Sequence, residues 1–164
     1  MKISAGALIF YQNNLLILKP SYRDYWLLPG GGLLEGESPR DACIREIREE
    51  ISLHVTLAQL LCIDFLPIGL TITGLNSTRT LKNEELTFLF LAESLTNLQK
   101  TQLCVDGKEI VSHQFVSLDE AKSHFPSYMV KRLPHCLNAI KDQTTYYLEN
   151  GEPTYPLITP RQSG

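Results

Sequence analysis

GGLLEGESPRDACIREIREEISL, residues 31–53, carries the strongest structural and chemical signal in this chain. Its second half predicts a helix from Ser38 to Ile51, because Cys43, Ile47 and Ile51 recur on one side at roughly 100° per residue. Ser38 is a good N-cap, and the proline after it is tolerated in a first helical turn. One face of this helix can therefore be buried against a sheet.

The polar flank of the predicted helix carries three carboxylates. Glu46, Glu49 and Glu50 are spaced by three and four residues, which places them on one face. Like charges so close repel one another, and an Arg45–Glu49 pair at i, i+4 neutralises only one of them. A hard divalent cation would neutralise the others, and Mg²⁺ commonly takes one or two carboxylates together with substrate phosphates. The alternative is a solvated surface helix, the ordinary role of paired glutamates.

The residues before the helix favour the metal-site interpretation. Gly30, Gly31 and Gly32 follow a short apolar segment, and glycines let a backbone approach a ligand closely. Their carbonyl oxygens are also suitable ligands for a hard metal ion. Glu37 lies at the entry to the helix, near its positive end. Glycine-rich turns are weak signals alone, so the indication comes from their position beside the carboxylates.

The composition of the whole chain is that of an ordinary globular protein. The chain has 164 residues, of which 43% are hydrophobic and 20% charged, and this predicts one domain with a substantial core. A net charge of −3 argues against binding of a nucleic-acid polymer, so phosphate must be neutralised locally by a few cations or by metal. The four cysteines form no CxxC pair, which argues against a zinc ribbon.

The N-terminal segment MKISAGALIFYQNN has the pattern of a strand rather than of a signal peptide. Its apolar run ends at residues 12–14 without a cleavage site, and a second apolar run follows at once. No apolar stretch is long enough to span a bilayer. We therefore expect a cytoplasmic protein that does not enter a membrane.

The rest of the chain alternates short apolar segments with polar ones. Strands are expected over residues 3–11, 15–19, 25–28, 55–66, 85–92 and 110–116, and further helices from 117 and over about 127–141. A hairpin turn is expected at Asn13-Asn14, and a strand break at Pro29–Gly32. Loops are expected over 73–83 and 94–108, with an irregular tail over about 150–164. This order predicts an α+β fold with helices on the sheet.

The segment quoted first resembles the Nudix box, written G-x5-E-x7-R-E-U-x-E-E-x-G-U with U bulky and apolar. The matching positions are Gly31, Glu37, Arg45-Glu46-Ile47, Glu49-Glu50 and Leu53. The lead-in WLLPGG at residues 26–31 also looks like that of the family. One position departs, since the second glycine of the family is Ser52 here. The close match covers residues 26–53, and the remaining chain agrees only in its order of elements.

The resemblance implies a Nudix fold, an α/β/α sandwich with a mixed, largely antiparallel sheet, in a single domain over residues 1–164. It also implies a metal site for Mg²⁺, with Mn²⁺ as an alternative. Carried over by position, the metal ligands would be Glu46, Glu49 and Glu50, with the Gly30 carbonyl as an additional ligand. Glu37 and Arg45 would orient the loop and the carboxylates, and Gly31 and Gly32 would lie close to the substrate.

Ser52 is expected to affect the end of the helix and not the metal site. A glycine just past a helix often takes a left-handed conformation, and a serine there costs about 1 kcal/mol. No metal ligand is lost by this change. We therefore expect activity to survive the departure.

An additional catalytic acid is expected outside the box. Glu109 is the first candidate, because it precedes the strand expected at 110–116, and Glu84 and Glu85 are competitors. Each of the three could instead be an ordinary surface acid. Trp26 could stack on a base, although a core role fits its expected strand better.

Four cations are candidate contacts to the substrate. Lys19 and Arg23 come shortly before the glycines, and Arg79 and Lys82 lie in the polar segment 73–83. Any one of them could be solvated instead, which is the ordinary state of a surface cation. The four histidines share no spacing that would indicate a metal site.

The leading hypothesis is an Mg²⁺-dependent enzyme that hydrolyses a phosphoanhydride bond in a nucleoside diphosphate linked to another moiety. A nucleotide-sugar or ADP-ribose-like substrate is slightly favoured over a nucleoside triphosphate. The alternative is a Nudix-fold sensor that binds a nucleotide without cutting it, although such modules usually lose box glutamates and this chain retains all four. An isoprenoid diphosphate isomerase is a third possibility. The partner is then a small nucleotide, and a homodimer is compatible with the sequence.

Overall fold

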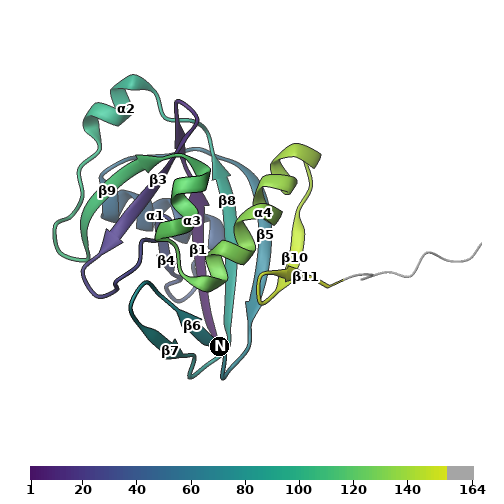
Figure 1. Ribbon diagram of the computed structural model, residues 1–164. Helices are drawn as coiled ribbons and strands as arrows, with labels where there is room; N and C mark the ends of the chain where they lie inside the picture. Colours follow the sequence, from purple (N-terminus) through teal and green to yellow (C-terminus); the bar gives the residue numbers. More distant parts are fainter. Residues whose placement is uncertain (155–164) are drawn as a thin grey trace, which may run out of the picture.

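The computed structural model describes residues 1–154 as a set of sheets flanked by helices (Figure 1). The strands are β1 Lys2–Leu8, β2 Phe10–Tyr11, β3 Asn14–Pro20, β4 Gly30–Gly32, β5 Leu57–Leu66, β6 Thr71–Thr73, β7 Thr78–Thr80, β8 Glu85–Ala92, β9 Ile110–Val116, β10 Tyr146–Glu149 and β11 Glu152–Pro153. The helices are α1 Pro39–Ile51, α2 Asn97–Gln102, α3 Leu118–His124 and α4 Ser127–Asp142.

The largest sheet mixes parallel and antiparallel pairs. Its strand order is β11-β10-β5-β8-β1-β4, with β1 parallel to β8 and β10 parallel to β5, while the other neighbours are antiparallel. A second sheet, β2-β3-β9, is antiparallel, and β6 and β7 form a separate hairpin. The mixed, largely antiparallel sheet expected from the sequence is therefore confirmed.

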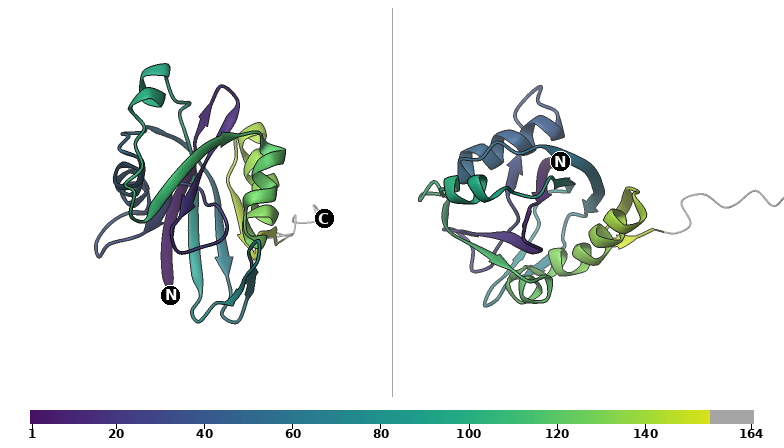
Figure 2. Two further views of the ribbon diagram at one scale, coloured as in Figure 1. Left: turned by 60° about the vertical axis from the view of Figure 1, so that its left-hand side comes forward. Right: turned by 90° about the horizontal axis from the view of Figure 1, so that it is seen from above.

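Two hydrophobic cores lie on opposite sides of the sheets. One core joins Ala5 and Ala7 of β1 to Ile47 and Ile51 of α1, while the other joins Leu8 and neighbouring strands to α3 and α4. Successive strand residues point to opposite faces, so one strand can serve both cores. Seen from above, α1 covers one side of the sheets and α4 the other (Figure 2). This is the predicted α/β/α sandwich, and the α+β class is confirmed.

The ends of α1 follow the signals in the sequence. The Ser38 side chain accepts a hydrogen bond from Asp41 N–H, as an N-cap does. Ser52 ends the helix with φ of 61°, in the left-handed region. The left-handed conformation expected at the position of the missing glycine is thus confirmed. Ser52 is strained there because it has a Cβ atom, which glycine lacks.

The first hairpin turn differs from the prediction by one residue. Tyr11 pairs with Asn14, so the turn residues are Gln12 and Asn13, at φ of 47° and 65°. Two successive positive φ values are the mark of a type I′ turn. Asn13 belongs to the turn as expected, but Asn14 already belongs to β3.

The predicted strand at Tyr25–Leu28 is wrong, and so is the strand break at the glycines. Only Leu27 forms a bridge, to Leu18, whereas Gly30–Gly32 is itself strand β4, paired with β1. A Cβ on Gly30, at φ of 146°, would collide with the Ala5 carbonyl. The glycines therefore allow a close strand pairing where their usual association with turns suggested a break.

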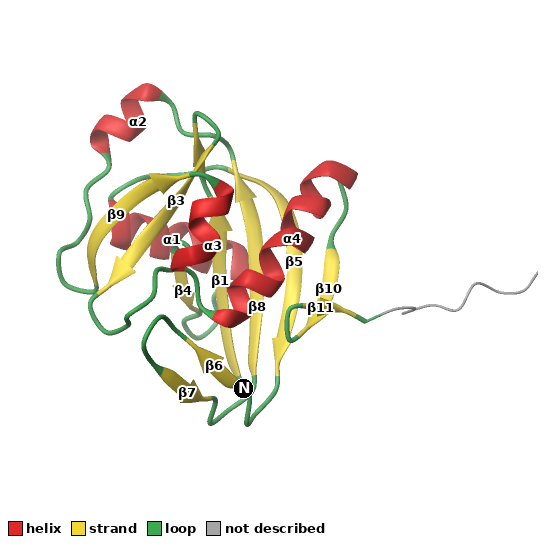
Figure 3. Ribbon diagram, viewed as in Figure 1, coloured by secondary structure: helices red, strands yellow, loops and turns green. Residues whose placement is uncertain are grey.

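Two predicted loops contain short elements. Residues 73–83 include β7, and residues 94–108 include α2, which Figure 3 shows on the connection between β8 and β9. Helix α2 is held by a capping box in which Thr96 and Gln99 bond to each other's backbone. Neither element has a buried apolar stripe of useful length, so hydrophobic periodicity did not indicate them.

The expected irregular tail begins with a strand. Residues 152–153 form β11 against β10, because Gly151 allows a tight turn at φ of 75°. The rest of the predicted tail, from residue 155, lies outside the described residues. Among the described helices, none combines the length and the apolar character needed to cross a membrane.

Candidate active site

The acidic face of α1 lies directly against strand β4. The Glu46 carboxylate occupies the space in which Gly31 would carry a side chain, so any Cβ there would collide with it. Four residues later, Glu50 Oε1 accepts a hydrogen bond of 2.7 Å from Gly30 N–H. Two carboxylates one helical turn apart are thus seated on two consecutive glycines. A side chain at Gly31 would displace the Glu46 carboxylate, and a side chain at Gly30 would collide with the backbone of β1.

Glu50 is an acid in an unusual environment. It is only 6% exposed, and burial raises the pKa of its carboxyl to about 8, although the Gly30 N–H bond opposes the shift. The charges of Glu46, Glu109 and Asp106 raise that pKa further. A buried carboxylate among other acids lacks a compensating positive charge, which is the environment that a cation would stabilise.

Arg45 organises the carboxylates around it. Its guanidinium donates through Nε and Nη2 to both oxygens of Glu37, at 2.8 and 2.9 Å. Nη2 also donates to the Gly32 carbonyl at 3.0 Å, while Nη1 donates to Glu46 at 2.9 Å and to Glu49 at 3.2 Å. The predicted Arg45–Glu49 pair is present, but it is the longest of five bonds. An arginine has five N–H donors, so its capacity is fully used here.

Glu37 fixes the loop that leads into α1. One of its oxygens also accepts a hydrogen bond from Leu34 N–H at 3.0 Å. The Arg45 hydrogen bonds, with that backbone bond, hold the pKa of the Glu37 carboxyl at about 2. Glu37 therefore stays ionised and serves Arg45 and the loop, which leaves Glu46, Glu49 and Glu50 as the acids of the helix face.

The donor set is suitable for a hard divalent cation. Glu46 and Glu50 of α1 contact neighbouring glycines of β4. Glu49 is the most exposed of the three glutamates, with 58% of its side chain accessible. Within residues 1–154, no three acidic, histidine or cysteine side chains are already gathered around one point. Mg²⁺ does not require such a cage, because it keeps several waters and takes one or two carboxylates. The residues present therefore fit this ion.

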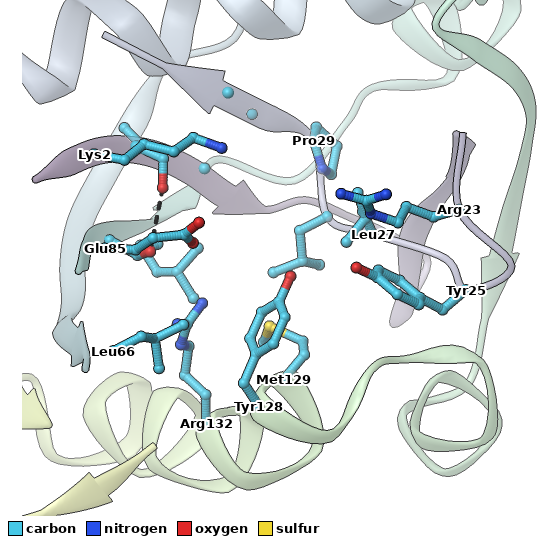
Figure 4. Close-up of a pocket in the computed structure, with 18 of the residues that line it drawn as sticks. Lys2, Arg23, Tyr25, Leu27, Pro29, Leu66, Glu85, Tyr128, Met129 and Arg132 are labelled. Carbon is cyan, nitrogen blue, oxygen red and sulfur yellow. Dashed lines mark hydrogen bonds between the residues drawn. The ribbon is translucent and has the colours of Figure 1, made fainter. Parts of the chain in front are cut away.

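Gly30 and Gly31 also form part of the wall of a pocket (Figure 4). Its cations are Lys2, Arg23, Arg79 and Arg132, and its aromatic residues are Tyr22, Tyr25 and Tyr128. Glu85 is its acid. The pocket thus combines donors for anionic groups with flat rings, directly beside the glycines that carry the acidic helix.

The predicted cations occupy different places. Arg23 and Arg79 both line the pocket, and Arg79 Nε donates to the Tyr25 hydroxyl at 3.3 Å. Lys19 lies outside the pocket lining, and its ammonium donates to the carbonyls of Pro20 and Arg23. Lys19 therefore supports the loop that carries Arg23.

The predicted acids outside the box are also separated. Glu109 lies close enough to Glu50 for its charge to raise the pKa of that carboxyl, and its carbonyl accepts a hydrogen bond from Ser21 N–H at 2.8 Å. Glu85 lines the pocket, whereas Glu84 contributes its carbonyl to Lys2 N–H. Trp26 packs against the core that includes residues of α3 and α4, and its ring meets that of His124 edge-on at 5.8 Å.

Sequence reasoning did not identify the far wall of the pocket. Tyr128 and Arg132 come from α4, and Lys2 is the second residue of the chain. A signal was present, because Arg132 falls on the buried side of an amphipathic helix and Asp64 in an apolar strand. Two charges in apolar contexts indicate a buried pair, but only the fold shows that they meet.

Comparisons with known proteins agree with this geometry. The family model described as the NUDIX domain matches residues 1–136. The 8-oxo-dGTP diphosphatase of Proteus vulgaris is 38% identical over 65 residues, which cover 37% of this chain and 58% of that enzyme. The chain thus matches less than two thirds of the length of that relative.

A second relative and a solved structure extend the similarity. An uncharacterized Nudix hydrolase of Bacillus subtilis is 28% identical over 123 residues, which cover 73% of each protein. The crystal structure of the MutT protein from Methanosarcina mazei superposes with a TM-score of 0.64 at 17% identity, over 87% of this chain and 94% of that one. With a family model matched over residues 1–136, and with Glu46 and Glu50 in contact with Gly31 and Gly30, the chain belongs to the Nudix family of hydrolases.

Proposed function

We propose that this protein hydrolyses a phosphoanhydride bond in a nucleoside diphosphate linked to another moiety, with Mg²⁺ as the bound metal and Mn²⁺ as a substitute. A water oxygen adds to one phosphorus while the bond from the bridging oxygen to that phosphorus breaks. The two products each carry a phosphate group, and the proton of the water passes to solvent or to an acid of the site.

One observation carries this proposal. Gly30 and Gly31 contact the carboxylates of Glu50 and Glu46, and the same two glycines line a pocket that contains four cations. A diphosphate placed along these glycines would have acids beside it for a metal and cations beyond it for negative charge. Placement of charge in this way accounts for most of the catalysis of phosphoryl transfer.

The side chains divide into ligands and positioning residues. Glu46, Glu49 and Glu50 would hold the ion, with the Gly30 carbonyl as a further ligand. When bound, Mg²⁺ withdraws charge from the phosphates and activates or orients water. Arg45 and Glu37 act through the ligands, because their hydrogen bonds fix the position of Glu46 and of the loop.

Glu109 is our candidate for the acid outside the box. The loop that carries it is tied to α1, since Asp106 N–H donates to the Glu50 carbonyl at 3.1 Å. Glu109 is exposed and its charge acts on Glu50. A Glu109→Gln variant should lose turnover while it still binds nucleotide; equal turnover would remove Glu109 from the site.

The test of the function is phosphate release over a panel of nucleotides. The panel includes nucleotide sugars, ADP-ribose, a dinucleoside polyphosphate and 8-oxo-dGTP, the compound in the name of the Proteus relative. Wild type, Glu49→Gln/Glu50→Gln and the control Glu35→Gln are compared with and without Mg²⁺. Glu35 is exposed and is not a fixed position of the box, so its change controls for lost charge.

Turnover that requires both Mg²⁺ and the two glutamates, and that survives Glu35→Gln, would support the hydrolase. We expect the double variant to lose at least about 100-fold, since a bound metal contributes several kcal/mol to the transition state. Nucleotide binding without turnover, under any metal, would overturn the proposal in favour of the sensor.

A further inference from the structure

Arg132 is a buried arginine with unused hydrogen-bonding capacity. It lies on α4, and only 3% of its side chain is exposed. Its Nε donates to Asp64 Oδ2 at 2.7 Å, and its guanidinium lies over the Tyr128 ring, 5.0 Å from the centroid. The ion pair is therefore made through Nε.

Asp64 is fully committed to holding this arginine. It is buried in β5, and its second oxygen accepts a hydrogen bond from Gly151 N–H at 3.0 Å. A larger residue in place of Gly151 would meet Lys131 and the backbone of Arg132, so the turn after β10 is closed tightly over the pair. Three elements, β5, α4 and the β10–β11 turn, thus fix the position of one guanidinium.

The free end of that guanidinium is at the wall of the pocket. Figure 4 shows Arg132 extending from α4 between Leu66 and Tyr128 towards Glu85. Among the described residues, Nη2 is buried and has no hydrogen-bond acceptor. A buried donor without a partner is costly, and native proteins rarely keep one unless a ligand or water satisfies it. An acceptor seated at the floor of this pocket would satisfy it.

The charge of the pocket indicates what kind of acceptor fits. Arg132 is neutralised by Asp64, but Lys2, Arg23 and Arg79 line the same pocket with Glu85 as its acid. Arginines are well suited to carboxylate and phosphate groups, which accept paired hydrogen bonds. The pocket therefore favours a moiety that carries negative charge over a neutral sugar.

We propose that Arg132 determines specificity, by donating to an anionic group on the moiety that is linked to the cleaved diphosphate. That group is a carboxylate or a phosphate, which offer the guanidinium the same chemistry. This inference rests on the proposed function for its substrate and narrows it, because it selects charged over neutral leaving moieties.

The test uses pairs of substrates that differ in the charge of this moiety. UDP-glucuronate and UDP-glucose test a carboxylate, and ADP-ribose with and without a phosphate on its terminal ribose tests a phosphate. We expect wild type to prefer the anionic member of at least one pair by about tenfold or more in kcat/KM. The pair that shows the preference identifies which anion is recognised.

Two variants remove the contact while protecting the fold. Arg132→Lys keeps a positive charge beside Asp64 but has no second nitrogen for a ligand. Asp64→Asn/Arg132→Gln removes both charges together, so no buried charge is left unpaired. Lys131→Gln is the matched control, because Lys131 is the neighbouring cation on α4, exposed and outside the pocket lining. Thermal melting confirms that each variant is folded.

In both variants the preference should fall to about one, chiefly through a higher KM for the anionic substrate, and Lys131→Gln should retain it. A wild type without preference, or folded variants that slow both members equally, would overturn the inference. Affinities for UDP-glucuronate and UDP-glucose, measured by calorimetry, test the role of Arg132 independently of the proposed hydrolase function. Selective binding without turnover would overturn the proposed hydrolase function but support the specificity role of Arg132. Turnover without selectivity would support the hydrolase function and overturn the role of Arg132.

Discussion

Arg45 and Arg132 meet carboxylates in opposite ways. Arg45 is 24% exposed at its side chain and makes five hydrogen bonds, four to glutamates and one to a carbonyl. Within residues 1–154, Arg132 is 3% exposed and makes one, to Asp64, with Nη2 left unsatisfied. The more exposed arginine has no donor left for a ligand, whereas the buried one does. The number of N–H donors without an acceptor, rather than the exposure of the side chain, therefore distinguishes an arginine that organises a site from one that can bind a substrate.

Loss of the Arg132 side chain should destabilise the protein more than any other change considered. Arg132→Ala leaves Asp64 charged and buried without its partner, which should cost about 3–5 kcal/mol of unfolding free energy. Urea denaturation measures this loss. The double variant Asp64→Leu/Arg132→Leu should recover most of it, and a single variant as stable as wild type would show that the pair contributes little.

Loss of the Arg45 side chain should mainly lower activity. Arg45→Ala should lower kcat/KM by about 10–100-fold, the usual cost of losing a group that orients metal ligands. Its effect on stability should be smaller than that of Arg132→Ala, because its partners remain near solvent. Arg45→Lys, with a single ammonium, should restore only part of the activity. Full activity in Arg45→Ala would contradict the organising role.

The pair of Arg45 with Glu37 should make the stability of the protein depend on pH. Because the Arg45 bonds lower the pKa of Glu37 from 4.5 to about 2, its contribution to stability is complete above pH 4.5 and is lost as the pH falls towards 2. Glu37→Gln lacks this ionisation and should lose less stability across that window. Chemical denaturation of both proteins at several pH values measures the difference. Parallel curves would show that the pair is not coupled to folding.

The smallest effect is expected at Ser52, which touches neither arginine. Ser52→Gly relieves a left-handed serine at φ of 61° and should stabilise the fold by up to about 1 kcal/mol, which raises Tm by a few degrees. Activity should stay the same, because Ser52 is no metal ligand. A lower Tm would show that the serine is not strained at the helix end.

The sequence predicted the box well because the box is local. The cap at Ser38, the helix to Ile51 and the shared face of Glu46, Glu49 and Glu50 depend on spacing within one helix, and the structure confirms the helix and its cap. The sequence failed at Gly30–Gly32, because pairing with β1 depends on a strand twenty-four residues and more away in the chain. Glycine rules describe local turns and contain no such information.

The family, the acidic helix and the left-handed conformation at Ser52 could therefore be predicted from the sequence alone, since each follows from neighbouring residues. The pocket, by contrast, depends on tertiary packing. Residues 2, 23, 79 and 132 reach one cavity because β1, β7, α4 and the loop that carries Arg23 converge there, and Asp64 meets Arg132 across sixty-eight residues. The pairing of a buried charge depends on long-range packing, and a one-dimensional pattern does not record which distant residue will satisfy it.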